Sequence, residues 1–313
     1  MISYAVRRLA AGLVLALLVT AITFFLLSFS FDDVVLSLVG PGATPEILEQ
    51  RANSLGLDRP VPLQYGEWLL GVVQGDLGVS YFTNEPVGAA AISRLTVTLS
   101  IVLFALVATA IIGTALGVMA ATRAGAVDRV TQSVSLVGLV VPNLLLAIML
   151  VYVFAIQLGL FPATGFTPLT TDPGRWLASI TLPTIVLVIG GVAGIAAQVR
   201  GAMIDELRKD YVRTLTTRGL PTRTIVLRYA LRGAAGPALT VLSLEFIGMF
   251  SGALIIERVF ALPGFGTYAF NSSLQGDIPV IMGITLFSVL LVVTVNLVVD
   301  LVGGWLNPKA RAL

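Results

Sequence analysis

The chain has 313 residues, of which 57% are apolar and only 12% are charged, with a net charge of +2. Because soluble domains carry about 25% charged residues, this composition excludes an ordinary soluble domain and predicts an integral membrane protein. The sequence contains no cysteine and no histidine, which excludes disulfides, thiolate nucleophiles, Cys/His metal sites and imidazole acid–base chemistry.

Six apolar blocks are long enough to cross a bilayer, since about 20 helical residues span a hydrocarbon core of about 30 Å. Backbone groups inside lipid must be paired within the protein, so we expect each block to be a helix. The blocks are residues 9–31, 95–122, 130–158, 176–199, 233–256 and 278–299. The predicted fold class is therefore all-α, a polytopic membrane protein with six transmembrane helices.

The first block follows Arg7 and Arg8 and has two interpretations, a cleaved secretory signal or a retained helix. The block is long for the apolar region of a signal, and no Ala-x-Ala cleavage pattern follows it. We interpret it as a retained signal-anchor helix. Within the third block, Pro142 is expected to kink the helix and free a carbonyl.

Residues 32–94 form the longest polar stretch, with eight acidic residues, three arginines and five prolines. We expect an external loop region here. Its Gly75-Asp76-Leu77-Gly78 run suggests either a cation loop or ordinary turn chemistry, and we favour the turn. Residues 159–175 and 257–277, which contain Pro and Gly, are also expected to be loops.

The placement of Lys and Arg predicts the orientation in the membrane. With the amino terminus in the cytoplasm, fourteen of the basic residues lie on the cytoplasmic side and five on the other. Both termini are therefore expected in the cytoplasm. The expected divisions are residues 1–31 (amino terminus and first helix), 32–94 (external region), 95–302 (transmembrane core, including a cytoplasmic loop at 200–235) and 303–313 (cytoplasmic tail).

Three of the expected helices carry a Gly-x-x-x-Gly pair, which lets helix backbones approach closely in lipid. The pairs are Gly113 with Gly117, Gly190 with Gly194, and Gly248 with Gly252. We favour packing within the bundle over a subunit interface as their role.

The cytoplasmic loop carries an amphipathic pattern. Between residues 203 and 218, apolar residues recur every four positions, and charged or polar residues occupy the other face. Gly219 is expected to end this helix, Pro221-Thr222 to restart it, and Pro237 to mark entry into the next span. The apolar stripe has two physical uses that the pattern does not separate, namely lying on the membrane surface and docking in a groove of another protein. The stripe consists of Met203, Ile204, Leu207, Tyr211, Val212 and Leu215.

Several runs occur in the order, and at the topological places, typical of one family. They are Leu55-Gly56-Leu57-Asp58-Arg59-Pro60 with Gln64-Tyr65; Gly75-Asp76-Leu77-Gly78 with Ser80 and Pro86-Val87; Pro142 with Leu160-Phe161-Pro162-Ala163-Thr164-Gly165; Asp210-Tyr211-Val212-Arg213-Thr214, Arg218-Gly219-Leu220, Leu231-Arg232 and Pro237; Glu257-Arg258-Val259-Phe260 with Pro263-Gly264-Phe265-Gly266; and Asn296, Asp300 and Asn307-Pro308-Lys309. Along nearly its whole length the chain resembles the permease subunits of ABC importers, most of all the B-type permease of dipeptide and oligopeptide transporters. The sequence departs from that pattern at Thr214-Leu215-Thr216-Thr217, where the family has Thr-Ala-Arg-Ala, and at Arg232-Gly233, where it has Arg-Asn.

The resemblance implies a type I importer fold in a prokaryotic plasma or inner membrane, with a cytoplasmic coupling helix. It implies a second homologous permease in a heterodimer, two ATP-binding subunits or domains that hold ATP and Mg, an external solute-binding protein that delivers substrate to residues 32–94, and a peptide substrate. It implies no cofactor on this chain, no catalysis by it and no nucleic-acid partner. The residues expected to couple to the ATPases are Asp205, Leu207, Asp210, Tyr211, Arg213, Leu215, Gly219 and Leu220.

Four residues are candidates for a gate or for the translocation pathway: Pro142, Asn143, Glu245 and Glu257. Glu245 lies in mid-span, where an ionisable group is costly and must face a cavity or a partner; the alternative is a neutral carboxyl hydrogen-bonded to a neighbouring helix. For Glu257 we favour a local cap or ion pair over a substrate contact. Asp300 is expected to anchor the cytoplasmic end of the last helix.

Other function classes find little support in the sequence. The two lysines, Lys209 and Lys309, do not follow a glycine, so the Gly-x-x-x-x-Gly-Lys-Ser/Thr motif is absent and ATP is expected to bind a separate protein. An ion-coupled secondary carrier, the alternative function, is expected to have paired intramembrane carboxylates or broken helices in related halves, and the chain offers only Glu245 and one mid-helix proline. An intramembrane hydrolase finds no support either, because the chain has no His, no Cys and no Gly-x-Gly-Asp run, and both lysines lie outside the expected spans.

Overall fold

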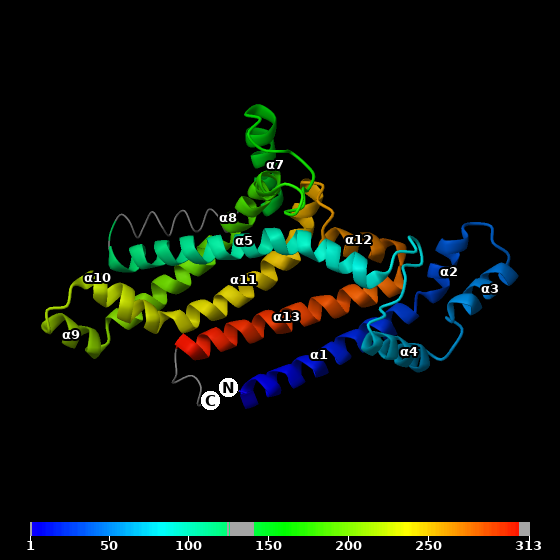
Figure 1. The fold of residues 1–313 in the computed structure, drawn as a ribbon, viewed down its shortest axis with the longest axis horizontal. Helices are drawn as coiled ribbons and strands as arrows, with labels where there is room; N and C mark the ends of the chain where they lie inside the picture. Colours follow the sequence, from blue (N-terminus) through cyan, green and yellow to red (C-terminus); the bar gives the residue numbers. More distant parts are fainter. Residues whose placement is uncertain (1, 124, 126–140, 307–313) are drawn as a thin grey trace. The chain divides into compact units, whose positions relative to one another are not determined.

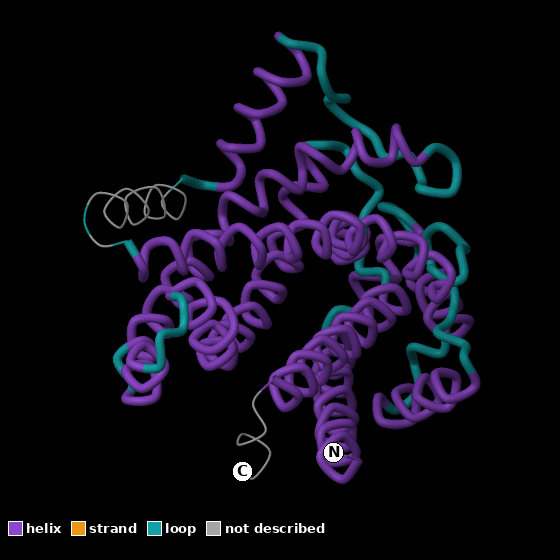
Figure 2. Tube along the Cα trace, turned by 60° about the vertical axis from the view of Figure 1, so that its left-hand side comes forward, coloured by secondary structure: helices purple, strands orange, loops and turns teal. Residues whose placement is uncertain are grey.

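The computed structural model describes residues 2–123, 125 and 141–306. In these ranges the chain consists of helices and their connections, with one isolated antiparallel bridge between Val79 and Pro86 and no strand (Figure 2). The all-α prediction is confirmed for this part of the chain.

The chain divides into two compact units, which we describe separately. Of the described residues, unit 1 comprises 97–123, 125, 141–262 and 295–306, and unit 2 comprises Ile2–Thr96 and Pro263–Thr294. Two long helices, α5 (Val87–Thr122) and α13 (Ile278–Leu306), begin in unit 2 and continue into unit 1.

Unit 2 contains most of the amino-terminal third of the chain. Besides the first parts of α5 and α13, its helices are α1 (Ile2–Ser28), α2 (Phe31–Val39), α3 (Pro45–Leu55), α4 (Val61–Gln74) and α12 (Phe265–Gln275). Its apolar core joins α1, α2 and α13 through Phe24, Phe31, Val34, Ile278 and Met282. The expected external loop region, 32–94, is therefore largely helical.

Unit 1 is built around two helices that lie side by side, α8 (Pro173–Leu207) and α11 (Leu231–Val259) (Figure 1). The other elements that lie wholly in this unit are α7 (Asn143–Leu150), the π-helix η1 (Val151–Gln157), α9 (Asp210–Thr217), α10 (Thr222–Thr224) and the π-helix η2 (Ile225–Ala230). One cluster of buried side chains holds α8, η2 and α11 together: Ile195, Val199, Met203, Val226, Ala230 and Ala234.

Five helical segments in the described ranges are long and apolar enough to cross a bilayer. They are Val6–Ser28, Val87–Thr122, Pro173–Leu207, Thr222–Val259 and Ile278–Gly303. The remaining expected span, 130–158, lies partly outside the described residues, and its described end is the shorter apolar helix Asn143–Gln157. The six-span topology therefore stays a prediction.

Four sequence-based expectations about the helices are wrong. The second long helix begins at Val87 rather than at residue 95, and the expected loop at 257–277 contains α12. Pro142 has extended backbone (ψ 131°) immediately before α7, so it precedes a helix and does not kink one. A proline is well tolerated there, because the first helical N–H groups have no intrahelical acceptor. Pro237 lies inside α11 and does not begin it.

The Gly-x-x-x-Gly pairs fall into two groups. A methyl group added at Gly113 would lie 2.8 Å from the Ile195 side chain, and one at Gly117 would lie 2.7 Å from the Ala196 carbonyl oxygen, so α5 packs directly on α8. The pair on α8 also faces its own chain, as described below. By contrast, Gly248 and Gly252 of α11 have no atom of the described chain within 4 Å of such a methyl group. Packing within the bundle is confirmed for the first two pairs. For the third pair no such contact is found in the described chain, and the subunit interface remains the alternative.

Candidate functional site

The candidate site is the segment Asp205–Leu220, where α8 ends and α9 begins. The sequence predicts one helix across residues 203–218, but α8 ends at Leu207 and the backbone of Lys209 is extended (ψ 149°) before α9 starts at Asp210. The single-helix prediction is therefore wrong, and the segment is a helix–turn–helix corner.

Gly219 closes α9 in the way that the sequence predicts. Its φ is +78°, a left-handed conformation that glycine adopts without the steric cost of a Cβ. The Gly219 N–H donates to the Thr216 carbonyl (3.0 Å) and the Leu220 N–H donates to the Leu215 carbonyl (3.2 Å). Pro221 then precedes α10, which begins at Thr222. The predicted stop and restart are both confirmed.

The apolar stripe of this segment packs on its own chain. Met203 and Val212 are buried, and Met203 belongs to the cluster that joins α8, η2 and α11. Leu207, Tyr211 and Leu215 are half-buried, as is Leu220, and α9 contacts η2. Much of the stripe is thus buried within unit 1 itself. Neither the membrane-surface nor the partner-groove interpretation predicts this burial.

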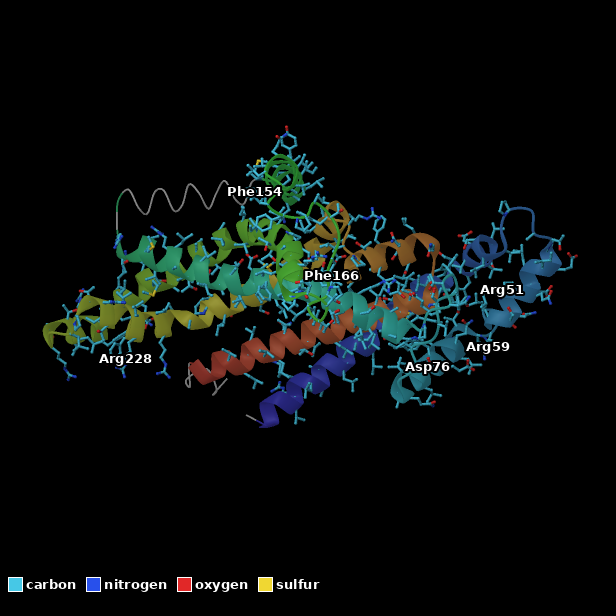
Figure 3. The ribbon with its side chains drawn as sticks, turned by 45° about the horizontal axis from the view of Figure 1, so that its top comes forward. Arg51, Arg59, Asp76, Phe154, Phe166 and Arg228 are labelled. Carbon is cyan, nitrogen blue, oxygen red and sulfur yellow. The ribbon has the colours of Figure 1, made fainter. Side chains whose placement is uncertain are left out.

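The opposite face of the segment is polar and exposed. Asp205, Asp210 and Arg213 all lie on it. The Asp210 and Arg213 side chains are 99% and 81% exposed and form an ion pair at 4.0 Å. Such a pair contributes about 0–1 kcal/mol to folding, so these charges have little structural role. Arg228 of η2 is also exposed at this end of unit 1 (Figure 3).

Glu206, which the sequence analysis did not single out, is the buried acid of the segment. Its carboxylate accepts hydrogen bonds from Lys209 Nζ (2.5 Å) and from the Tyr211 hydroxyl (3.0 Å). Burial, together with the hydrogen bond to Glu206, raises the pKa of Tyr211 to about 12, so this hydroxyl keeps its proton at neutral pH. The three-residue spacing of Glu206 and Lys209, which suits a helical ion pair, was the available signal.

Two of the gate candidates lie against a short glycine-rich stretch of α8. A methyl group added at Gly190 would lie 3.0 Å from Asn143 Oδ1, and one at Gly194 would lie 2.5 Å from Glu245 Oε1. Glu245 Oε2 is similarly close to Gly191 (3.2 Å). The structure thus brings Asn143 and Glu245 to one face of α8, with Pro142 directly before Asn143.

Glu257 lies elsewhere, in the last turn of α11, and is fully buried. The Thr98 hydroxyl of α5 donates a hydrogen bond to Glu257 Oε1 (2.5 Å). This contact ties α5 to α11 and agrees with a structural role. A second tie joins α11 to α13, where the Ser243 hydroxyl donates to Asn296 Oδ1 (2.5 Å). The terminal Asn307-Pro308-Lys309 run lies outside the described residues.

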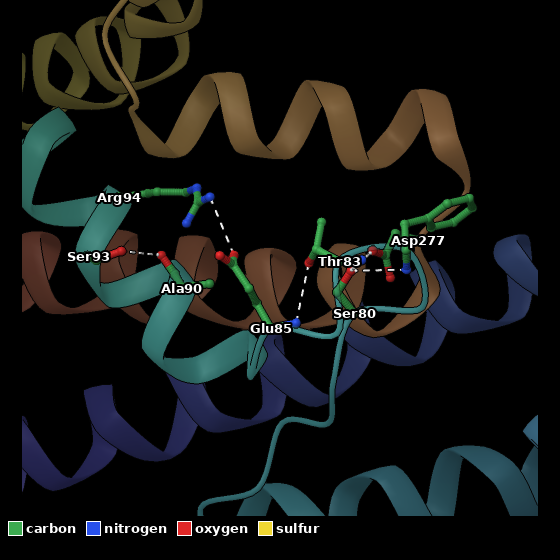
Figure 4. Close-up of polar contacts among 8 residues, drawn as sticks. Ser80, Thr83, Glu85, Ala90, Ser93, Arg94 and Asp277 are labelled. Atoms are coloured by element: carbon green, nitrogen blue, oxygen red, sulfur yellow. Dashed lines mark hydrogen bonds and ion pairs between the residues drawn. The ribbon is translucent and has the colours of Figure 1, made fainter. Parts of the chain in front are cut away.

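A separate polar cluster in unit 2 holds the turn between α4 and α5 (Figure 4). Asp277 is 1% exposed and accepts hydrogen bonds from the Ser80 hydroxyl (2.5 Å) and the Tyr81 N–H (3.2 Å). Burial and the Asp277 charge raise the pKa of Tyr81. Arg94 pairs with Glu85 at 3.5 Å.

The run that suggested a cation loop forms an ordinary turn. Asp76 Oδ1 accepts a hydrogen bond from the Gly78 N–H at 2.8 Å, as turn chemistry predicts. Within residues 2–123, 125 and 141–306, no cluster of three or more acidic side chains is arranged to hold a metal ion.

Comparison with family models gives two matches that together span most of the chain. Residues 113–312 match the model described as "Binding-protein-dependent transport system inner membrane component". Residues 1–102 match the model for the amino-terminal part of the same transport-system membrane components.

Individual relatives align from end to end. A Brucella abortus protein, provisionally named a peptide transport system permease, is 35% identical over 306 residues, covering 97% of this chain and 98% of its own length. The oligopeptide transport system permease protein AppB of Bacillus subtilis is 30% identical over 313 residues, covering 99% of both chains. Among solved structures, a chain of the inward-facing MetNI methionine ABC transporter has the same fold, with a TM-score of 0.59 and 16% identity over 71% of this chain and 99% of its own.

Proposed function

Since this chain belongs to the family of binding-protein-dependent transport system inner membrane components, we propose that it is the permease subunit of an ATP-driven importer of dipeptides or oligopeptides. The observation that carries the proposal is the end-to-end alignment, at 30% identity or more, with relatives named as peptide or oligopeptide transport permeases. The fold shared with a chain of an ABC transporter agrees with it.

The proposed assembly contains several other chains. A second, homologous permease completes the translocation pathway, so that this chain forms half of it. Two ATP-binding subunits or domains hold ATP and Mg, and an external solute-binding protein delivers the peptide to residues 32–94. The chain itself catalyses no covalent step and binds no cofactor.

The proposed topology has six spans in a prokaryotic plasma or inner membrane, with both termini and the 200–235 loop in the cytoplasm. The distribution of Lys and Arg along the chain supports it. The five long apolar helices and the apolar Asn143–Gln157 helix are consistent with this count. Residues 32–94, 95–302 and 303–313 are then the external region, the permease core and the cytoplasmic tail.

We propose that Asp205–Leu220 couples the permease to the ATPases. The exposed charges of Asp210 and Arg213 offer a contact surface, since they contribute little to the fold. The buried side, through Met203 and Val212, transmits a displacement of α9 to α8 and to the η2–α11 helix. ATP binding and the loaded solute-binding protein must each favour one state of the permease, because a ligand shifts an equilibrium only through its differential affinity for the two states.

A single substitution in the corner tests this coupling. In Gly219→Trp, a side chain is forced onto a left-handed residue (φ +78°), a conformation that costs about 1–2 kcal/mol for an L-residue. We expect the permease to insert and assemble, while peptide-stimulated ATP hydrolysis of the purified complex falls about tenfold. Asp210→Lys, which alters an exposed charge, is expected to act in the same direction.

The matched control is Gly201→Ala on α8, where an added methyl group meets no atom within 4 Å. It should behave as wild type. Wild-type stimulation in Gly219→Trp, with intact subunit association, would exclude a coupling role for this corner.

A further inference from the structure

Glu206 is the point at which three helices of unit 1 meet. It lies in the last turn of α8, one residue before that helix ends, and the whole residue is 8% exposed. Through Lys209 it is bound to the turn between α8 and α9, and through the Tyr211 hydroxyl to the first turn of α9. One carboxylate therefore fixes the direction in which α9 leaves α8.

The same carboxyl group also lies against the beginning of α11. A methyl group added at Gly233 would overlap Glu206, with Cδ and Oε1 as its nearest atoms and Cγ at 2.8 Å. Gly233 has a helical backbone and no positive φ, so the glycine is required for space and not for conformation. The absence of a side chain at residue 233 is therefore what admits Glu206.

A negative charge on the buried Glu206 carboxylate is unfavourable unless Lys209 and Tyr211 are in place. A carboxylate in the last turn of a helix faces the negative end of the helix dipole, and a buried charge requires compensating hydrogen bonds. Lys209 supplies the positive charge, and the Tyr211 hydroxyl supplies a donor that stays protonated at neutral pH. The contact between α8, α9 and α11 is thus conditional on all three groups being in place.

We propose that Glu206 is a positioning residue that makes the α8–α9 corner and the start of α11 move as one body, so that a displacement of α9 by the ATPases reaches both long helices. This inference rests on the proposed function, because it assigns a role within the coupling segment. It assigns the transmission of the displacement to a buried carboxylate, whereas the exposed charges of α9 offer the contact surface.

The test uses the complete transporter, with its partner permease, ATPases and solute-binding protein, in lipid nanodiscs. The variants are Glu206→Ala, Tyr211→Phe, Gly233→Ala and the double variant Glu206→Ala with Gly233→Ala. Basal ATP hydrolysis, its stimulation by the loaded binding protein and, in liposomes, radiolabelled dipeptide taken up per ATP are measured for each. Matched controls are Tyr229→Phe, which removes an exposed hydroxyl of η2, and Gly236→Ala, where an added methyl group meets no atom within 4 Å.

We expect Glu206→Ala and Gly233→Ala each to lower dipeptide uptake per ATP about tenfold, with basal hydrolysis and subunit association kept. Tyr211→Phe, which removes one of the two hydrogen bonds, should have a smaller effect in the same direction. The double variant should lose no more than Glu206→Ala alone, because without that carboxyl the methyl group at residue 233 has room. If the substitutions only destabilised the fold, the losses of the two single variants would add in the double variant, and less of the complex would assemble.

A spectroscopic measurement separates positioning from stability. Because the chain has no cysteine, a spin-label pair can be placed at Leu177→Cys on α8 and Thr217→Cys on α9, both exposed positions. We expect one narrow distance distribution with Glu206 and a broad one with Glu206→Ala. If the wild-type complex is stimulated but the Glu206 and Gly233 variants match it in uptake per ATP and in distance distribution, the inference is wrong. If the wild-type complex itself shows no stimulation, the proposed function is wrong instead.

Discussion

Asp277 shows how one buried carboxylate orders an irregular segment of unit 2. Residues 79–86 contain no helix, and the β-bridge between Val79 and Pro86 is the one element of regular backbone pairing in this described segment. Asp277 is 1% exposed, and its two oxygens accept from the Ser80 hydroxyl and the Tyr81 N–H. Hydrogen bonds to a charged group contribute about 1.5–3 kcal/mol each, which is enough to hold a short turn in place.

Ser80→Ala tests this contact. The substitution leaves the buried carboxylate without its hydroxyl donor, so the free energy of unfolding should fall by about 1.5–3 kcal/mol. Thermal unfolding of the purified chain in detergent measures the change. Ser54→Ala is the control, because the Ser54 hydroxyl is exposed and donates only to the Arg51 carbonyl. Equal melting temperatures for both variants would contradict the role given to Asp277.

At the scale of residues, the sequence predicted positions with a local cause and missed those with a tertiary one. Gly219 was predictable, because a glycine after an amphipathic run is a common way to end a helix. The ion pair of Glu206 with Lys209 could be expected from their spacing, but the contact of Glu206 with Gly233 could not, since Gly233 is distant in sequence and approaches it only in the folded chain. Gly233 departs from the pattern of the family that the chain resembles, but the sequence does not indicate which side chain occupies the space that the glycine leaves.

Close helix packing in unit 1 depends on glycines placed where two backbones meet. At Gly117 of α5, an added methyl group would lie 2.7 Å from both the Ala196 carbonyl oxygen and Val199 Cβ of α8. The carbonyl is backbone and cannot turn away as the end of a side chain could. Helix association in lipid relies on such close approach, because apolar burial gives little advantage over lipid contact.

Gly117→Ala is therefore expected to push α5 away from α8. Forcing extra atoms into a packed interface costs about 1–3 kcal/mol, so the variant should unfold at a lower temperature in detergent. Gly201→Ala, on α8 but with open space around the added methyl group, should be unchanged. An unaltered melting temperature for Gly117→Ala would show that the two helices are not held at this distance.

At the scale of elements, apolar length predicted the long helices, and polar helices escaped detection. The run from α2 to α4 was expected to be loop because of its prolines and charges, although Pro45 opens α3 and Gly56 closes it in a left-handed conformation. No residue of α3 is buried, so the helix lacks the apolar stripe by which a sequence reveals an amphipathic helix. The break at Arg208–Lys209 was hidden for the opposite reason, since the stripe continues across it.

At the scale of the whole molecule, the proposed importer draws its energy from outside this chain. In the proposed assembly nucleotide binds the ATPases, so the permease changes state only if its partners bind its conformations with different affinities. In the proposed assembly, the ATPases contact the corner at Asp205–Leu220 and bind one permease conformation more tightly than the other. The contacts between α8 and α11 transmit the resulting displacement through unit 1. The solute-binding protein supplies the corresponding difference from the external side.

Reconstitution in liposomes tests this dependence most directly. The chain is incorporated alone, or together with its partner permease and ATPases, and uptake of a radiolabelled dipeptide is followed with and without ATP, Mg and the loaded solute-binding protein. If the chain is the proposed permease subunit, uptake is expected only with the complete assembly and with nucleotide present. Uptake by the isolated chain without nucleotide, driven by an ion gradient, would contradict it.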